Sequence, residues 1–212
     1  MKLSTALMML KGSPVPFLRM NLVQIAGAGV SGPQNYYFSH HQADPHHTGM
    51  AEAFKFDTHF IGAGGGVPVT GIDGQLYRMM SVHNVRMNPN TEGLDISDIP
   101  AYMLDGTGPD VMVTGQLSGC VFAIRQEAHR LLVAHVQPGN GRQDGPLLRQ
   151  TIRMMGRLHH AGAGGRVTHV FGIPDYSARA HVIGVRTGGT WHIYAQCVTT
   201  GMGPITASSM II

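Results

Sequence analysis

The chain has 212 residues, of which 43% are hydrophobic and only 13% are charged, and its formal net charge is +3. This length suffices for one domain with a substantial core, and the 29 glycines favour a turn-rich, strand-rich fold over a helical bundle. The only two cysteines, Cys120 and Cys197, exclude a multi-cysteine disulfide framework, and no segment is long and apolar enough to predict a membrane-spanning helix.

The first twenty residues precede the first expected strand. Their apolar run, residues 1–10, resembles a short secretion signal, but Lys11 interrupts it and no clear cleavage site follows. We therefore expect a helix or a disordered leader over residues 1–20 and a single folded domain over residues 21–212. The thiol content fits a reducing cytosol, and export by a route that needs no cleavable signal stays open.

Short apolar runs bounded by Gly, Pro, Asn and Asp predict strands along most of the chain. Before residue 140 they lie at 22–26, 36–39, 54–61, 77–87, 111–114, 120–125 and 131–136, with a short apolar piece at 99–104. The polar stretch 39–48 and the glycine run 62–66 between these strands predict a loop and a turn.

One convincing helix follows the central strands. Asp144 is a good cap, Pro146 suits the first turn, and apolar residues recur at helical spacing through Leu158 and His159. The glycine-rich segment 162–165 is expected to end this helix. Strands at 167–171, 181–186 and 190–198 follow, with a hairpin at Gly188 and Gly189. The pattern predicts an α+β fold, in which helices flank a β-sandwich core rich in antiparallel strands.

Cys120 and His135 stand at the two ends of a predicted hairpin. If strands 120–125 and 130–135 pair around a loop at 126–129, Cys120 lies directly opposite His135 on one face of the sheet. A register change of two residues would move the pair to a diagonal, whereas a slip of one residue would send His135 to the other face. The two side chains are therefore expected to lie side by side.

A thiol beside an imidazole is a nucleophile with its base. An imidazolium lowers the pKa of a neighbouring thiol, and the same histidine can return the proton to a departing amine. The turn at Ser118 and Gly119 offers backbone N–H groups that suit an oxyanion, and the Thr114 hydroxyl is a candidate to orient the imidazole.

A non-catalytic interpretation of Cys120 competes with this hypothesis. A lone cysteine at the start of a strand is usually a small buried apolar residue, and with 13 histidines in the chain one will often lie near it by chance. Residues 121–212 carry 9 arginines against 3 acidic residues, whereas residues 1–120 carry 6 basic and 9 acidic residues. A non-catalytic binding module, whose basic C-terminal half engages an acidic protein or a nucleic acid, is the alternative.

Other polar groups have simpler interpretations than a functional site. Four histidines around Asp44 could hold a transition metal, but a solvated loop is preferred because adjacent His–His pairs rarely share one ion. The pair His159–His160 suits a helix C-terminus, and Trp191 and Cys197 are expected in the core. The four histidines are His40, His41, His46 and His47, and the arginines predicted on a solvated helix face, without an aromatic stacking series, are Arg149, Arg153 and Arg157.

The sequence Leu117-Ser118-Gly119-Cys120, with His135 fifteen residues later, resembles the Leu-Ser-Gly-Cys signature of the cytotoxic necrotizing factor catalytic domain and of Burkholderia lethal factor. Thr114, six residues before the cysteine, matches the threonine of the Thr–Cys–His constellation in the lethal factor. The chemotaxis receptor deamidases use a similar set. The resemblance covers residues 114–135, and outside them only the order of elements is shared.

The resemblance implies a glutamine deamidase with a β-sandwich core and outer helices. Cys120 would attack a glutamine carboxamide of a host protein, His135 would assist, and no cofactor or metal would be needed. Relatives act on Rho-type GTPases or on a translation-initiation helicase, and this choice does not carry over to the present chain. We expect a monomeric toxin, secreted or delivered into a host cell, with neither a membrane nor a nucleic acid as partner. A transglutaminase or a thiol protease on the same dyad is a weaker alternative.

Overall fold

The computed structural model describes residues 1–26, 29–41, 52–58, 77–88, 95–199 and 204–212. The helices are α1 (Leu3–Gly12), α2 (Pro14–Met20), the 3-10 turn η1 (Arg142–Asp144) and α3 (Gly145–Met155). Among the described residues, no helix has the length and apolar character needed to cross a bilayer.

The largest sheet has eight strands. Their spatial order is β1 (Asn21–Ile25), β3 (Glu52–Asp57), β2 (Gly32–His41), β4 (Tyr77–Val85), β8 (Val111–Thr114), β14 (Arg179–Thr187), β15 (Thr190–Val198) and β16 (Ile205–Met210). The β1–β3 and β4–β8 pairs are parallel, and the other neighbours are antiparallel.

Two smaller sheets complete the fold. The five-stranded sheet has the order β13 (His169–Phe171), β9 (Val121–Gln126), β10 (Leu131–Val136) and β5 (Met87–Asn88), with β7 (Tyr102–Leu104) also paired to β10. The three-stranded sheet consists of β12 (Ala163–Arg166), β11 (Arg157–His160) and β6 (Ile99–Pro100).

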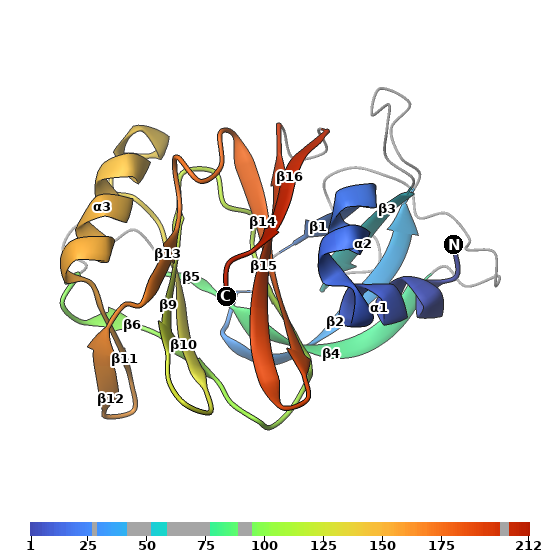
Figure 1. The fold of residues 1–212 in the computed structure, drawn as a ribbon, viewed down its shortest axis with the longest axis horizontal. Coiled ribbons are helices and arrows are strands. Elements are labelled where there is room, and N and C mark those ends of the chain that lie inside the picture. Colours follow the sequence, from blue (N-terminus) through green and yellow to red (C-terminus); the bar gives the residue numbers. More distant parts are fainter. Residues whose placement is uncertain (27–28, 42–51, 59–76, 89–94, 200–203) are drawn as a thin grey trace.

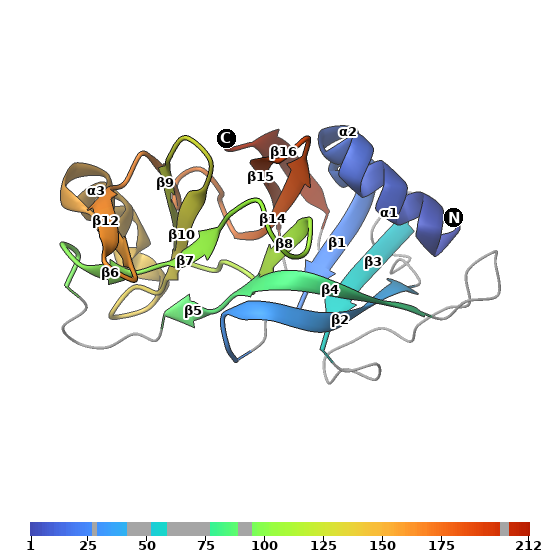
Figure 2. The ribbon, with the colours of Figure 1, turned by 90° about the horizontal axis from the view of Figure 1, so that it is seen from below.

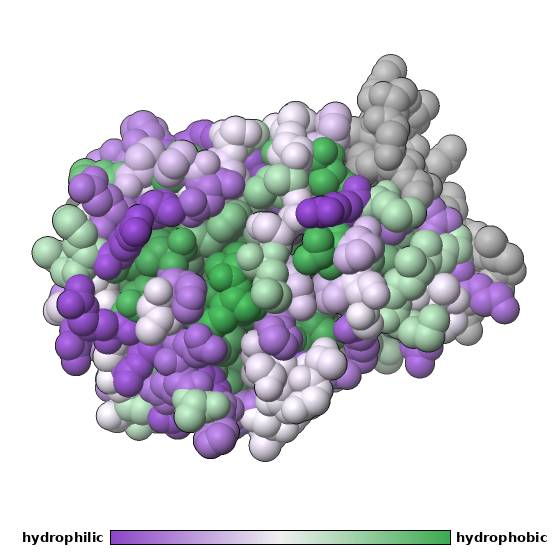
Figure 3. Space-filling view, viewed as in Figure 1, coloured by the Kyte–Doolittle hydropathy of each residue, from purple (hydrophilic) through white to green (hydrophobic). Residues whose placement is uncertain are grey.

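The five-stranded sheet packs face to face on the β8–β14–β15 part of the large sheet (Figure 1). Phe122 and Val133 from the smaller sheet and Val182 and Ile193 from the larger sheet belong to one buried apolar cluster. These positions alternate along their strands with residues of the opposite face, as sandwich packing requires. The predicted α+β fold with a strand-rich sandwich core is therefore confirmed. Apolar residues reach the surface near the C-terminus, along the seam between the two sheets (Figure 3).

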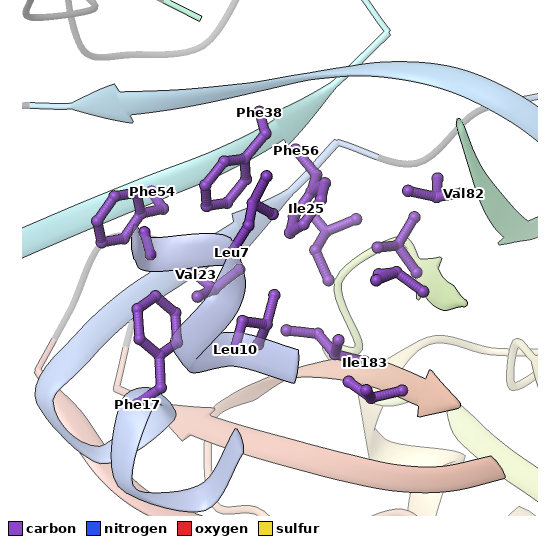
Figure 4. Packing of buried hydrophobic residues seen from close by; sticks show 14 of the residues in the cluster. Leu7, Leu10, Phe17, Val23, Ile25, Phe38, Phe54, Phe56, Val82 and Ile183 are labelled. Atoms are coloured by element: carbon purple, nitrogen blue, oxygen red, sulfur yellow. The ribbon is translucent and has the colours of Figure 1, made fainter. Parts of the chain in front are cut away.

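The large sheet curls so that its edge strand β1 contacts β15, which lies next to the opposite edge. The backbone N–H of Val23 on β1 donates to Gln196 Oε1 on β15 at 2.9 Å, and Gln196 Nε2 donates to the Asn21 carbonyl at 2.8 Å. Helices α1 and α2 lie beside β1 and β3 (Figure 2). Leu7 and Leu10 of α1 point into the aromatic cluster of the β2 and β3 strands (Figure 4). Residues 3–20 are thus two helices that share the core of the large sheet.

The predicted helix is shorter than expected. It ends at Met155, and Leu158 and His159 lie on strand β11 instead. Gly156 has an extended backbone, and a Cβ at this position would lie 2.5 Å from the Ile152 carbonyl oxygen. Leu158 still packs in the same cluster as Ile152, on the outer face of the five-stranded sheet. Apolar spacing alone does not distinguish a longer helix from a helix followed by a strand that packs in the same core. The interpretation of His159–His160 as a helix end was therefore wrong.

Other boundaries also differ from the sequence-based expectation. Strand β2 runs through His40 and His41, which were predicted in a loop, and β16 was not predicted because its residues are small and polar. The expected strand 77–87 breaks at Arg86, after which the chain passes from the large sheet to the five-stranded sheet. Residues 42–48 of the predicted histidine loop, residues 59–61 of a predicted strand and the glycine turn 62–66 lie outside the described residues.

Candidate active site

Thr114 and His135 meet where the two sheets face each other. Thr114 is the last residue of β8 in the large sheet, and His135 lies near the end of β10 in the five-stranded sheet. The Thr114 Oγ1 atom is 2.8 Å from His135 Nδ1 and 2.6 Å from the carbonyl oxygen of Val85. The exposed fractions of the two side chains are 0% and 1%, so this contact is fully desolvated.

The hydrogen-bond partners of Thr114 fix the tautomer of the imidazole. A carbonyl can only accept, so the single hydroxyl proton of Thr114 goes to Val85. His135 Nδ1 must therefore carry a proton and donate it to Thr114 Oγ1. The lone pair then resides on His135 Nε2, which is buried and has no hydrogen-bond partner in the described structure.

Burial keeps this imidazole neutral. It lowers the pKa of His135 from 6.5 to about 4, because the imidazolium would lose its hydration. At neutral pH the ring is therefore an uncharged base with a free lone pair. A buried, unsatisfied acceptor normally costs stability, and such groups cluster where function requires them.

Cys120 lies on the same face of the five-stranded sheet as His135, but not directly opposite it. In the observed register Phe122 pairs with His135 and Arg125 with Leu132, so the expected register was wrong by two residues. The four-residue loop is Glu127–Arg130, closed by ion pairs from Glu127 to Arg125 at 3.1 Å and to Arg130. Because the shift is even, Cys120 stays on the His135 face, one diagonal step away.

Met87 lies next to both residues, through its backbone at His135 and through its sulfur at Cys120. It pairs with His135 across the parallel β5–β10 ladder, so the two side chains leave the sheet on the same side. Its Sδ atom lies 3.8 Å from Cys120 Sγ. Met87 is 38% exposed, whereas Cys120 is 5% exposed. No sequence pattern pointed to this residue, because Met87 reaches the site only through the break of the strand at Arg86.

The resting thiol is protonated. Burial raises the pKa of Cys120, and the backbone N–H groups of Ser118 and Cys120 oppose this shift only in part. No hydrogen bond joins the thiol to the imidazole in the described structure. The expectation of an imidazolium that lowers the thiol pKa does not describe this state, because desolvation disfavours both charged forms.

Tyr176 clamps the turn that carries the cysteine. Its hydroxyl accepts a hydrogen bond from Gly119 N–H at 2.9 Å and donates one to the Cys120 carbonyl at 2.8 Å. Gly119 has φ +138°, and a Cβ there would lie 2.7 Å from Arg142 Cα, so only glycine fits. The N–H of Gly119 is therefore occupied by Tyr176, whereas the backbone N–H groups of Ser118 and Cys120 favour the charged form of the thiol and so lower its pKa.

Gln116, just before this turn, is held by two polar side chains of β14. Arg179 Nη1 donates to Gln116 Oε1 at 2.9 Å, and Gln116 Nε2 lies 3.2 Å from His181 Nε2. Leu117 also pairs with Ala180 of β14 through two backbone hydrogen bonds. Residues 116–120 are thus attached to the large sheet on one side and to Tyr176 on the other.

The remaining candidates do not join this site. Cys197 and Trp191 are buried in the core as expected, with exposed fractions of 5% and 4%. His40 and His41 lie on β2, whereas His46, His47 and Asp44 lie outside the described residues. Arg149 and Arg153 lie on α3, where Arg149 pairs with Asp175 at 2.7 Å, but Arg157 lies on β11. Within the described part of the chain, no group of three or more His, Cys, Asp or Glu residues could hold a metal ion.

A cavity of about 420 Å³ lies at the other end of the β9–β10 hairpin. Its walls come from the loop around His129 and from the β14–β15 turn, with Trp191 between them. Cys120 lies before the first residue of β9, whereas the cavity adjoins Gln126, the last residue of that strand. The cavity is therefore separate from the Thr114–His135 contact.

No protein-family model matches the sequence. A search of curated proteins gives no significant match.

Proposed function

We propose that the chain is a cysteine-dependent protein glutamine deamidase of the toxin or effector class, acting on a host protein. One observation carries the proposal. The Thr114–His135 contact leaves the imidazole Nε2 unpartnered on the sheet face that also carries Cys120. Nucleophile, base and orienting hydroxyl then come from three separate strands or turns of one site.

The two catalytic groups are neutral before reaction. As Cys120 Sγ attacks the substrate carboxamide carbon, the thiol proton passes to His135 Nε2. The tetrahedral intermediate collapses as the carbon–nitrogen bond breaks, and Nε2–H protonates the departing nitrogen, which leaves as ammonia. Nε2 then takes a proton from water, whose oxygen attacks the thioester. Glutamate leaves, and sulfur regains its proton.

Each supporting residue has a role in this sequence. Thr114 holds the tautomer that presents the Nε2 lone pair and accepts Nδ1–H while the ring is charged. The backbone N–H groups of Ser118 and Cys120, which favour the charged form of the thiol, are the candidate oxyanion donors. Gly119 contributes backbone shape instead, because Tyr176 accepts its N–H.

The test is a comparison of a host-cell lysate treated with the native protein or with the Cys120→Ser variant. We expect specific glutamines to gain about one dalton, the mass difference between an amide and an acid, only with the native protein, because oxygen replaces sulfur as the nucleophile in the variant. Mass spectrometry of tryptic peptides reports the change. Cross-linked or cleaved products would assign a transglutaminase or a protease instead, and identical peptides from both samples would contradict the proposal.

A non-catalytic binding module remains the second candidate, because Cys120 is buried and its pKa is raised, as for an inert core thiol. The basic C-terminal half would then engage an acidic partner. In that case Cys120→Ser would alter the free energy of unfolding and leave every glutamine of the lysate unchanged.

A further inference from the structure

We propose that the Met87 side chain is a movable gate over the Cys120–His135 pair, and that it swings aside to admit an unbranched carboxamide side chain. The nature of the admitted side chain rests on the proposed function. The gate itself concerns only the access of reagents to the Cys120 thiol and does not depend on that function.

The position of Met87 is set by two independent contacts. Its backbone pairs with that of His135 in the β5–β10 ladder, and its sulfur touches Cys120 Sγ at 3.8 Å. Met87 is the exposed member of this group: its exposed fraction is 38%, against 5% for the cysteine and 1% for the histidine. A reagent approaching the thiol from solvent therefore meets the thioether first.

The other walls of the site are fixed. Thr114 is held by Val85 and His135, and Tyr176 is held by two backbone groups of the cysteine turn. Phe122, which pairs with His135, is fully buried within the sandwich core. Met87 is unbranched and has several rotatable bonds, and its side chain can change rotamer without moving a strand. Of these residues, Met87 can open the site at the lowest conformational cost.

The unpartnered lone pair of His135 Nε2 gives a reason for the site to open. A neutral ring nitrogen with 1% exposure and no partner in the described structure would be a costly feature of a closed core. When Met87 moves, a substrate amide can approach both this nitrogen and the sulfur. We therefore expect the opening to admit a narrow, linear side chain such as that of glutamine more readily than a branched or aromatic one.

The experiment measures the rate at which Cys120 is alkylated by iodoacetamide and by the bulkier N-ethylmaleimide. Rates are followed by peptide mass spectrometry across the titration range of the thiol, so that a change in thiol pKa is separated from a change in access. The proteins are the native chain, Met87→Ala, Met87→Leu and Met79→Ala. Met79, which is 59% exposed on β4, is the matched control because it is also a surface methionine and lies on the strand just before β5, away from Cys120.

We expect Met87→Ala to raise the limiting alkylation rate of Cys120 about tenfold, with a larger gain for the maleimide, since access limits the reaction of a buried thiol. Met87→Leu, stiffer but of similar size, should react no faster than the native protein, and Met79→Ala should match it. Cys197, equally buried at 5%, reports general loosening and should not change. Equal Cys120 rates in the native protein and Met87→Ala, or a parallel rise at Cys197, would overturn the gate. None of these readings depends on deamidation.

Discussion

His135 and His181 are two histidines that are almost equally buried but differ in which ring nitrogen has no hydrogen-bond partner in the described structure. Their exposed fractions are 1% and 2%, and burial lowers the pKa of each to about 4. Each also has one ring nitrogen with no hydrogen-bond partner in the described structure. By burial, charge state and pKa the two side chains are hardly distinguishable.

The difference lies in which nitrogen is left free. At His135 the Thr114 hydroxyl takes the Nδ1 proton and leaves a basic Nε2. At His181 the amide of Gln116 is oriented by Arg179, so Gln116 Nε2 donates to His181 Nε2 and the ring proton resides on Nδ1. The unpartnered atom of His181 is thus an N–H donor, which cannot accept a proton.

This comparison shows why a shifted pKa alone does not identify a site. Desolvation produces the same shift wherever an imidazole is buried. Only the partners of the ring decide whether a lone pair is presented, and only the neighbouring strand decides whether a thiol lies on the same face. His135 satisfies both conditions through Thr114 and Cys120.

The largest expected effect separates the two histidines by activity. His135→Asn keeps an N–H donor for Thr114 but removes the base, and we expect deamidation to fall about 10³-fold. His181→Gln keeps an acceptor for Gln116 and should retain most of the activity. The measurement is the glutamate yield at modified glutamines in a host-cell lysate over time. Equal losses in both variants would mean that the free lone pair has no special role.

The two histidines should contribute equally to the loss of stability at low pH. Between pH 6.5 and about 4 the unfolded chain binds a proton at each histidine whereas the native state does not, so stability falls as the pH is lowered through this window. Each histidine is expected to account for a loss of roughly 3 kcal/mol, at about 1.4 kcal/mol per pKa unit. Urea titrations at several pH values measure it.

The same two variants are the controls for acid stability. His181→Gln and His135→Asn should each flatten the pH dependence of the unfolding free energy by a similar amount, although only one of them abolishes activity. A native protein whose stability does not change over this pH window would show that the imidazoles are not buried in their neutral form.

The smallest effect concerns the orienting hydroxyl. Thr114→Val preserves shape but leaves the Val85 carbonyl and His135 Nδ1–H unpaired, at a cost of about 1–3 kcal/mol in stability. The imidazole proton is then free to move to Nε2, and we expect deamidation to fall about tenfold. Stability comes from urea unfolding and activity from the lysate assay.

Thr114→Ser should restore most of both properties, because it returns the hydroxyl. If Thr114→Val lost stability but no activity, Thr114 would be a structural residue only, and the tautomer argument for His135 would fail.

Much of the site follows from local sequence. The short motif around Cys120 and the alternation along two neighbouring strands predicted that Cys120, Phe122 and His135 share one face, and the structure places them there. Alternation is robust, because a change of register by two residues leaves every side chain on its face. The exact partner of His135 was wrong, because the β9–β10 ladder continues to the Gln126–Leu131 pair and the hairpin loop therefore lies one residue further along the chain.

The amino-acid sequence by itself determined the strand-rich sandwich, the buried face of the hairpin and the residue types of the proposed nucleophile and base, because these depend on periodicity and on chemistry within a few residues. Only the tertiary structure decided which nitrogen of His135 is free, that Tyr176 occupies Gly119 N–H, and that Met87 covers the thiol. Those contacts join residues that are 21, 57 and 33 positions apart in the chain. Long-range packing and the crossing between sheets at Arg86 set them, and no local pattern records either.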